Sequence, residues 1–395
     1  MRIITNNLNN TWIPAFAGMT KEDMITNKKI ALVHDHLAQD GGAEKVLKVL
    51  ADMFPEAPIY TLLYEEKHVN KYFKGREIKT SIIQKLPGGV KHYQWYLKYM
   101  PIAVEFFDLS DFDIVISDAS AFAKGVITKP DTLHICYCHT PTRYLWDYTH
   151  QYINELSYNK YFKKVISLVL NKLRIWDFVA AQRVDLFIAN SQTVQKRISK
   201  YYRRDSEIIY PPVELSRFKI SNESKDYFLI GGRLAAYKRI DIVVEAFKKL
   251  KDKKLKIFGS GVDIERLKSI ANGADNIEFL GRVSEDEKAE LYSNCLAFIN
   301  PQEEDFGITV VEAMASGRPV IAYKKGGATE TVISGKTGLF FDNQSVESLV
   351  EAINVFDKHE FNSSEIKKHA ESFSEQIFKD KINIFISQNS QGEID

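Results

Sequence analysis

Two carboxylates eight positions apart, Glu304 and Glu312, are the residues of this chain whose spacing points most directly to chemistry. The short apolar segment from Cys295 to Asn300 precedes the first, and a helical pattern from Val310 to Ala315 contains the second. Glu304 is therefore expected on the loop leaving a strand, and Glu312 about two turns into the next helix. In parallel α/β sheets, ligands bind beyond the carboxyl ends of the strands, where helix N-termini offer free amides.

This placement suggests a ligand of the form sugar–diphosphate–ribose. One carboxylate would bind the hydroxyls of the sugar and the other those of the ribose, with a phosphate on the amides between them. The alternative is that Glu304 is an ordinary loop residue and Glu312 a solvated residue of a helix. Most acidic residues taken at random are exposed in this way. The residues around the pair favour the ligand site.

Two cations are expected at the same edge of the sheet. Arg233 closes the first strand of the second half of the chain, and Lys238 follows five residues later at a predicted helix start. Charge develops on a diphosphate as its bond to a sugar breaks, and two fixed cations can stabilise that charge without a metal. A pair of ordinary surface basic residues is the alternative.

Three glycine pairs or triplets could let backbone approach a phosphate, although such pairs more often mark only a turn. They are Gly41-Gly42, Gly259-Ser260-Gly261 and Gly326-Gly327. The last pair precedes Glu330, whose carboxylate is expected to act as a charge at a helix N-terminus.

His139 follows the predicted strand from Leu133 to Cys138 and would face across a cleft. It could bind a sugar hydroxyl or stabilise positive charge at an anomeric carbon, whereas a lone strand-end histidine is more often structural. Zinc binding is an alternative because His134, Cys136 and Cys138 alternate onto one face of that strand. Their spacing is unlike that of metal-binding thiolates and no second cysteine pair exists, so no metal site is predicted.

Composition excludes several classes of protein. The 395 residues have 45% hydrophobic and 27% charged content and a net charge of +1, which disfavours nucleic acid as a partner. Three cysteines cannot form a disulfide framework and suit a reducing compartment. No apolar run approaches the roughly 20 residues that span a bilayer.

The order of elements predicts two tandem α/β domains. Strands of the first half are expected at Ile30–Val33, Ile59–Leu63, Ile114–Ser117, Leu133–Cys138 and Leu186–Asn190. Those of the second half are expected at Tyr227–Ile230, Leu255–Gly259, Ile277–Leu280, Leu296–Asn300, Val320–Tyr323 and Gly338–Phe341. Each is short and apolar, as parallel strands buried on both faces should be. Pro211-Pro212 blocks helix and central strand and predicts the linker.

The predicted boundaries follow from this pattern. Residues 1–27 are expected to be a disordered extension, with Met19 or Met24 as alternative starts, and 28–211 and 212–374 form the two domains. The segment 375–395 holds a last helix, which either belongs to the second domain or packs back on the first.

A basic, apolar segment in the first half indicates a membrane surface as one partner. Tyr158 to Arg174 contains five basic residues and no acid, interleaved with apolar side chains, and Lys91 to Met100 is rich in aromatics. A basic amphipathic helix can lie on an anionic membrane, although an ordinary surface helix has the same pattern.

Taken in order, the motifs resemble the retaining glycosyltransferases of family 4. The resemblance covers about residues 28 to 388. Its motifs are Glu304-x7-Glu312 with Phe306-Gly307, Ala313-x-Ala315-x-Gly317-x-Pro319-Val320, Gly41-Gly42-Ala43-Glu44, His139-Thr140-Pro141, Ala189-Asn190-Ser191, Gly232-Arg233-Leu234-x3-Lys238 and Phe279-Leu280-Gly281. The stretch from Leu133 to Asp147 is similar to bacterial mannosyltransferases that build surface polysaccharides such as lipopolysaccharide.

The resemblance implies a GT-B fold, in which two Rossmann-like domains face each other across an active-site cleft. By position, Glu304 would bind the donor sugar, Glu312 the ribose, and Arg233 and Lys238 the diphosphate. Other implied donor contacts are Gly41, Gly42, the amides of Phe306, Gly307, Ile308 and Thr309, and the base-pocket residues Arg282 and Val283. His139 would touch the transferring sugar. The residues between Arg233 and Lys238 depart from the commoner family pattern but keep the charge.

The implied activity is metal-independent hexosyl transfer with retention, without a cofactor, from GDP-mannose or, second, a UDP-sugar. The acceptor would be a glycan or lipid-linked saccharide, and the enzyme would be cytoplasmic and associated with the inner face of the cytoplasmic membrane. A sugar-nucleotide epimerase of the same fold and a silent nucleotide-sugar-binding subunit are the alternatives. The intact set Arg233, Lys238, Glu304 and Glu312 argues against the latter.

Overall fold

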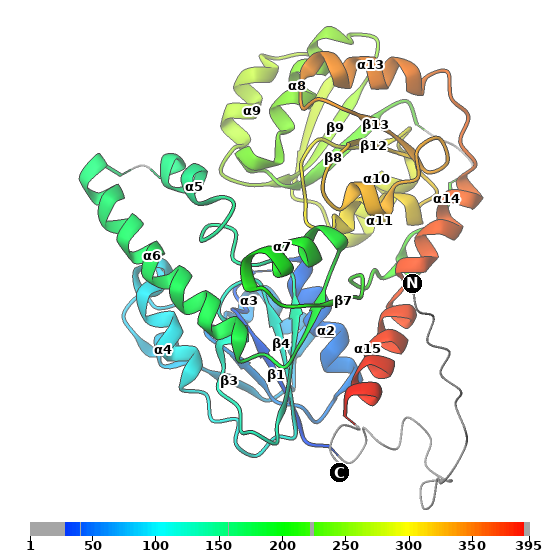
Figure 1. The fold of residues 1–395 in the computed structure, drawn as a ribbon. Coiled ribbons are helices and arrows are strands. Elements are labelled where there is room, and N and C mark those ends of the chain that lie inside the picture. Colours follow the sequence, from blue (N-terminus) through cyan, green and yellow to red (C-terminus); the bar gives the residue numbers. More distant parts are fainter. Residues whose placement is uncertain (1–27, 40, 157, 222–224, 391–395) are drawn as a thin grey trace, which may run out of the picture.

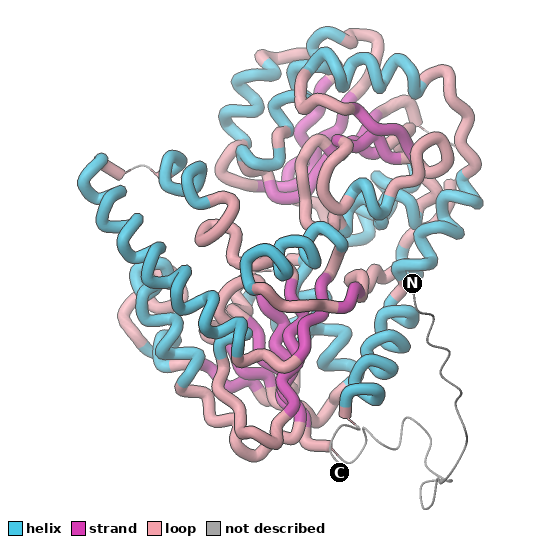
Figure 2. The backbone as a smooth tube through the Cα atoms, in the orientation of Figure 1, coloured by secondary structure: helices cyan, strands magenta, loops and turns pink. Residues whose placement is uncertain are grey.

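The computed structural model describes residues 28–39, 41–156, 158–221 and 225–390, without the side chains of residues 68–71 and 155. The predicted extension at residues 1–27 lies outside the described residues, as do residues 391–395. Two all-parallel sheets, each between layers of helices, organise the described chain (Figures 1 and 2). We call each sheet with its helices a lobe.

The first sheet has seven strands in the order β3-β2-β1-β4-β5-β6-β7. Its strands are β1 (Ile30–His34), β2 (Ile59–Thr61), β3 (Ile78–Thr80), β4 (Ile114–Ala119), β5 (Leu133–Cys138), β6 (Leu186–Ala189) and β7 (Glu207–Ile208). Its helices are α2 (Gly42–Met53), α3 (Glu66–Phe73), α4 (Met100–Glu105), α5 (Thr149–Glu155), α6 (Lys160–Gln182) and α7 (Gln192–Tyr202).

The second sheet has six strands in the order β10-β9-β8-β11-β12-β13. Its strands are β8 (Phe228–Arg233), β9 (Leu255–Ser260), β10 (Ile277–Gly281), β11 (Phe298–Asn300), β12 (Val320–Tyr323) and β13 (Gly338–Phe341). The helices that follow these strands are α8 (Ile240–Lys249), α9 (Ile264–Ala271), α10 (Glu285–Asn294), α11 (Ile308–Ala315), α12 (Ala328–Thr331), α13 (Val346–Phe356), α14 (Ser363–Ala370) and α15 (Glu375–Asn389).

Alternate residues of each central strand face opposite helix layers. In β1, Ala31 and Val33 pack in the core that α4, α6 and α7 cover, whereas Leu32 packs in the core of α2. In β8, Leu229 contributes to the core under α10, α11 and α14, and Ile230 to that under α8, α9 and α13. This burial on both faces explains why the strands are continuous apolar runs.

The strands that the sequence pattern did not predict are β3 and β7, which lie at the two edges of the first sheet. Both are short, and β7 has only two residues, one of them the exposed Glu207. Edge strands need little apolar content because one side faces solvent, so they lack the buried run that identifies the central strands.

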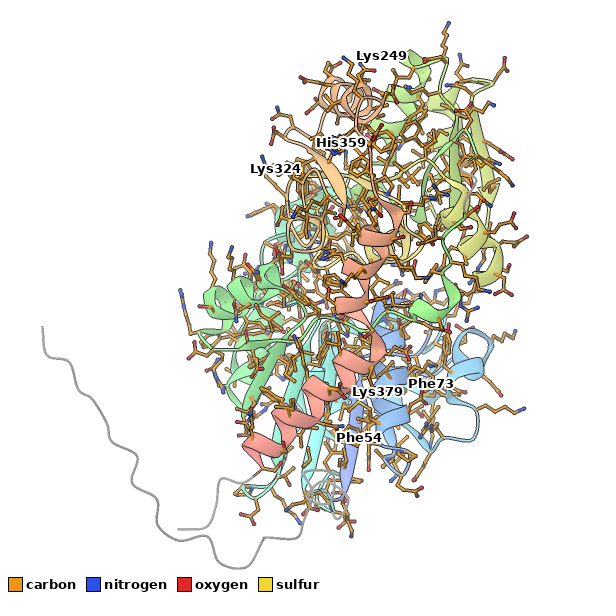
Figure 3. All side chains as sticks on the ribbon, turned by 90° about the vertical axis from the view of Figure 1, so that its right-hand side faces the viewer. Phe54, Phe73, Lys249, Lys324, His359 and Lys379 are labelled. Atoms are coloured by element: carbon orange, nitrogen blue, oxygen red, sulfur yellow. The ribbon has the colours of Figure 1, made fainter. Side chains whose placement is uncertain are left out.

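The chain crosses between the lobes twice, and the two crossings lie side by side. The Val213 amide donates to the Phe373 carbonyl at 3.0 Å, beside a bridge between Val213 and Ser374. Helix α15 then runs along the first lobe (Figure 3), where Phe378 and Ile382 share a core with Leu32 of β1. The last helix therefore packs on the first lobe, whereas the residue boundaries of the domains stay predictions.

Candidate active site

The carboxyl edge of the second sheet brings Glu304 and Lys238 together. Glu304 lies on the loop between β11 and α11, and Lys238 ends the short 3-10 helix η5 (Ala236–Lys238) that follows β8. Because β8 and β11 are neighbours in the sheet, the two side chains meet in an ion pair, each 17% exposed. Lys238 lies at the start of α8, as expected, and is separated from its first residue only by the N-cap Arg239, which has a left-handed backbone.

Positive charge accumulates around Lys238. Burial, followed by the nearby Arg233, lowers the pKa of Lys238 to about 8, and Arg143 acts in the same direction. Asp305 acts in the opposite direction and raises the pKa of Lys238. The ion pair with the Glu304 carboxylate also favours the charged lysine. The Arg233 guanidinium also donates to Oε1 of Gln39 in the first lobe at 2.7 Å. Cations of both lobes thus converge where a diphosphate would sit.

Glu312 is not the solvated helical acid of the alternative interpretation. It is the fifth residue of α11, so it lies just over one turn into the helix rather than two, and it is 2% exposed. Lys45 and Lys288 each donate to its Oε1 at 3.1 Å, and the Tyr292 hydroxyl donates to Oε2 at 3.3 Å. Burial alone would raise the pKa of Glu312, but the two lysines outweigh it and hold that pKa below its usual range.

The start of α11 is shaped to present backbone rather than side chains. Gly307 has φ 90°, a left-handed conformation that glycine adopts without strain, and α11 begins at Ile308. The amides of Ile308 and Thr309 belong to the first turn, where helices leave donors free. The ring of Phe306 instead packs in the core, stacked on Tyr210 at 5.6 Å, so only its backbone can serve a ligand.

The first lobe approaches this helix end through its glycine pair. A Cβ on Gly42 would lie 3.0 Å from Cδ1 of Ile308, so a larger residue would crowd the contact between lobes. The Gly41 amide donates to Glu44 at the start of α2. Gly42 therefore lies against the first residue of α11, and its predicted role at a phosphate stays a prediction.

His139 follows β5 and belongs to a buried network that the sequence did not reveal. Its Nε2 lies 2.6 Å from Oδ1 of Asp118, and Nδ1 of His34 lies 2.8 Å from Oδ2 of the same carboxylate. Asp118 is fully buried at the end of β4, whereas the His139 side chain is 12% exposed. One buried carboxylate therefore orients the partly exposed His139 side chain.

The same network predicts a pH dependence of stability. Burial lowers the pKa of His34, but Asp118 and Glu44 outweigh it and raise that pKa to about 10. Because the pKa of His34 is higher in the folded protein than in the unfolded chain, its protonation stabilises the fold. This contribution is complete below about pH 6.5 and is lost as the pH rises through about 10. Urea unfolding across this range should show a decline that His34→Gln flattens and that His150→Gln, at an exposed histidine, retains. An equally steep decline in His34→Gln would contradict the assignment.

The remaining candidates lie in other settings. Arg282 is exposed beyond β10, and Val283 packs against the core beneath α10 and α11. His134, from the zinc alternative, is fully buried with Nε2 at 2.9 Å from the Ser117 hydroxyl. Glu330 lies in the first turn of α12, and its carboxylate accepts from the amides of Gln192 and Thr193, so it also caps α7 across the lobes.

Sequence reasoning missed the partners of the predicted residues. They are His34, Asp118, Lys45, Lys288, Tyr292 and Arg197. The first two could have been found, because each is a polar residue ending a buried parallel strand, at the edge where ligands bind. The lysines and Tyr292 lie on helices at ordinary polar positions, so their convergence on Glu312 appears only in three dimensions.

Comparison with known proteins assigns both lobes. Residues 40–217 match the family model described as Glycosyltransferase Family 4, and residues 213–379 match that of Glycosyl transferases group 1. The alpha-1,3/1,6-mannosyltransferase ALG2 of Dictyostelium discoideum is 23% identical over 439 aligned residues, which cover 94% of this chain and 100% of the relative.

Two further comparisons are more local or more distant. A GDP-mannose-dependent alpha-(1-6)-phosphatidylinositol monomannoside mannosyltransferase of Mycobacterium tuberculosis is 35% identical over 136 residues, covering 31% of this chain and 35% of the relative. The structure of Anabaena HepE in complex with UDP and glucose superposes with a TM-score of 0.68 at 19% identity, over 91% of this chain and 100% of that one. This likeness shows the fold. The chain is therefore an enzyme of the family 4 glycosyltransferases, with two parallel α/β lobes in the GT-B arrangement that the sequence predicts.

Proposed function

We propose that the protein transfers a hexose, with retention of anomeric configuration, from a nucleotide sugar to a glycan or lipid-linked saccharide in surface-polysaccharide synthesis. The Lys238–Glu304 pair carries this proposal, because it joins a cation to the carboxylate proposed to bind the sugar, and Arg197 links the neighbouring Asp305 to Thr140 beside His139. GDP-mannose is the first candidate donor, supported by the names of the two mannosyltransferase relatives. A UDP-sugar is the second, supported by the UDP in HepE.

The proposed mechanism divides the work between the lobes. Glu304 and Glu312 hold the sugar and ribose, while Arg233 and Lys238 stabilise the charge that develops on the leaving diphosphate. The leaving phosphate accepts the proton of the acceptor hydroxyl at an oxocarbenium-like transition state, on whose positive charge His139 acts. We propose that these cations make a metal unnecessary. Contact between the lobes excludes water, which competes as an acceptor.

Thermal-shift measurements against GDP- and UDP-sugars test the donor, followed by product analysis. GDP-mannose should raise the melting temperature and be consumed. A shift with UDP-sugars alone would transfer the proposal to the second donor. Release of an epimer from the donor alone would indicate an epimerase, and binding without hydrolysis or transfer would indicate a silent subunit.

We further propose that the first lobe works at the cytoplasmic face of an anionic membrane. Among the described residues, no helix is long and apolar enough to cross a bilayer. Helix α6, at the outer edge of the first lobe in Figure 1, exposes an apolar stripe formed by Tyr161, Val165, Leu168, Ile175 and Val179. The same helix carries basic residues without acids in its first half, which suits anionic headgroups.

A second exposed apolar patch continues this surface. Trp95 and Tyr99 of the 3-10 helix η2 (Tyr93–Tyr99) and Ile102 and Phe106 of the α4 region are each about half exposed or more. Helix α4 contacts α6 through a hydrogen bond from Trp176 Nε1 to Glu105 at 2.8 Å. The two apolar patches therefore lie on helices that contact each other, and we propose that both meet the headgroup layer.

Vesicle co-sedimentation tests this surface. The protein should bind vesicles containing phosphatidylglycerol, and Leu168→Glu with Ile175→Glu should weaken binding about tenfold or more, because two charges must enter the interface. Val262→Glu, at a 97% exposed position of the second lobe, is the matched control. Equal binding by the double variant would contradict the proposal. A dimer that the same substitutions dissociate would assign the stripe to a second copy instead.

A further inference from the structure

Arg197 of α7 joins loops that belong to opposite halves of the site. Its guanidinium forms an ion pair with Asp305 of the second lobe. Within the first lobe, its Nε lies 3.0 Å from Asp147, and its Nη1 lies 3.4 Å from the Thr140 hydroxyl. The side chain is only 11% exposed, so these contacts are largely shielded from water.

The partners of Arg197 are chain neighbours of the residues that would touch the substrate. Asp305 directly follows Glu304, and Thr140 directly follows His139. A shift of Arg197 would therefore displace the donor-side loop relative to the acceptor-side loop. Neither Glu304 nor His139 contacts Arg197 itself in the hydrogen bonds and ion pairs of the described residues.

The loop and the helix that hold Arg197 in the first lobe are themselves anchored. The loop from Thr140 to Asp147 is held from behind by Asp177 of α6, a fully buried carboxylate that accepts from Thr142 and Trp146. Helix α7 is itself capped from the second lobe by Glu330. The first-lobe side of the bridge is therefore held in place, and the ion pair with Asp305 attaches it to the second lobe.

We propose that Arg197 is a positioning residue that sets the Glu304 loop against the His139 loop and thereby aligns the donor sugar with the acceptor side. This rests on the proposed function for its chemistry, and on the interlobe contact for its geometry. A planar guanidinium with several fixed donors can bridge two carboxylates and a hydroxyl at once, which the point charge of lysine cannot.

Hydrolysis of GDP-mannose, with water as acceptor, supplies the kinetic test. Arg197→Ala should lower kcat about 30-fold with the dissociation constant of GDP-mannose changed less than threefold, because most of the expected donor contacts come from the second lobe. Arg197→Lys should recover only a small part of that loss. Lys196→Ala removes an exposed charge from the same helix and should behave as wild type. Full recovery in Arg197→Lys, or a loss confined to donor affinity, would overturn the proposal.

The partner variant Asp305→Asn keeps the test valid if Arg197→Ala fails to fold. It should show the same loss of kcat, and the double variant should lose no more than either single one, since both remove one interaction. Additive losses would overturn the proposal. Melting temperatures of all variants are measured to exclude unfolding as the cause.

A distance measurement separates this proposal from the proposed function. The three natural cysteines are buried, so spin labels can be directed to cysteines introduced at the exposed Lys129 and Lys251, one on each lobe. Pulsed electron resonance should give a narrow interlobe distance distribution in the wild type and in Lys196→Ala, and a broader one in Arg197→Ala. An unchanged distribution in Arg197→Ala would overturn the positioning role. A wild type that turns over no nucleotide sugar would instead overturn the proposed function.

Discussion

Replacement of Lys238 by alanine is expected to lower kcat for sugar transfer about a thousandfold while leaving the fold intact. Removing a single preorganised group that stabilises developing negative charge costs about two to three orders of magnitude in well-studied enzymes. Lys238 has a further role here, because it contacts the Glu304 carboxylate expected to hold the sugar. Initial rates of GDP release at saturating GDP-mannose give kcat, and circular dichroism checks the fold.

Glu304→Ala should have a similar effect, and the pair allows a sharper test. Because the two side chains form one ion pair, the double variant should lose much less than the product of the single losses. Lys251→Ala, at an exposed position of the same lobe, is the control and should retain full activity. Near-normal turnover in Lys238→Ala or Glu304→Ala would exclude the proposed assignment of the site.

Replacement of Glu312 by glutamine is expected to lower the free energy of unfolding by about 3 kcal/mol, because it removes one partner of a buried ion cluster. The Lys288 side chain is 11% exposed and the Lys45 side chain 30% exposed, and both would lose their charged acceptor. Lys288 would still form its ion pair with Glu285 at 2.9 Å. The expected loss of stability is therefore at the lower end of the range for buried ion pairs. Urea unfolding measures the loss.

Two further variants make the Glu312 result specific. Adding Lys45→Met to Glu312→Gln should restore part of the stability, since the uncompensated cation is then replaced by an apolar side chain. Glu290→Ala removes an exposed surface pair with Lys225 and should change stability by less than about 1 kcal/mol. If Glu312→Gln were as stable as the wild type, the buried cluster would not hold this helix as described.

Central elements of both lobes could be predicted because their burial leaves a local pattern. Strands β5 and β12 begin and end at the predicted residues, as does the edge strand β13, and helix α11 ends at the predicted Ala315. Each central strand is buried on both faces and therefore forms an apolar run, whereas the edge strands β3 and β7 are too short and polar to do so.

The candidate residues could be placed at one edge of a sheet, but their surroundings could not be foreseen. Glu304 and Lys238 meet because β8 and β11 are adjacent, although 66 positions separate the two residues. Burial of Glu312 depends on Lys45, which lies 267 positions away in the other lobe. Such long-range pairs leave no mark on the local periodicity from which elements are predicted.

The sequence by itself determined the two-lobed α/β architecture, the order of its strands along the chain and the types of residue that end them. These properties follow from local hydrophobic pattern and from the loops that parallel strands require. Only the tertiary structure decided that Glu312 is an ion-paired core residue, that Asp118 orients His139 and that Arg197 bridges the lobes. Those properties depend on which side chains of distant segments are buried together. A buried charged group is costly unless it is paired, so the contacts depend on the partners that the fold brings to it.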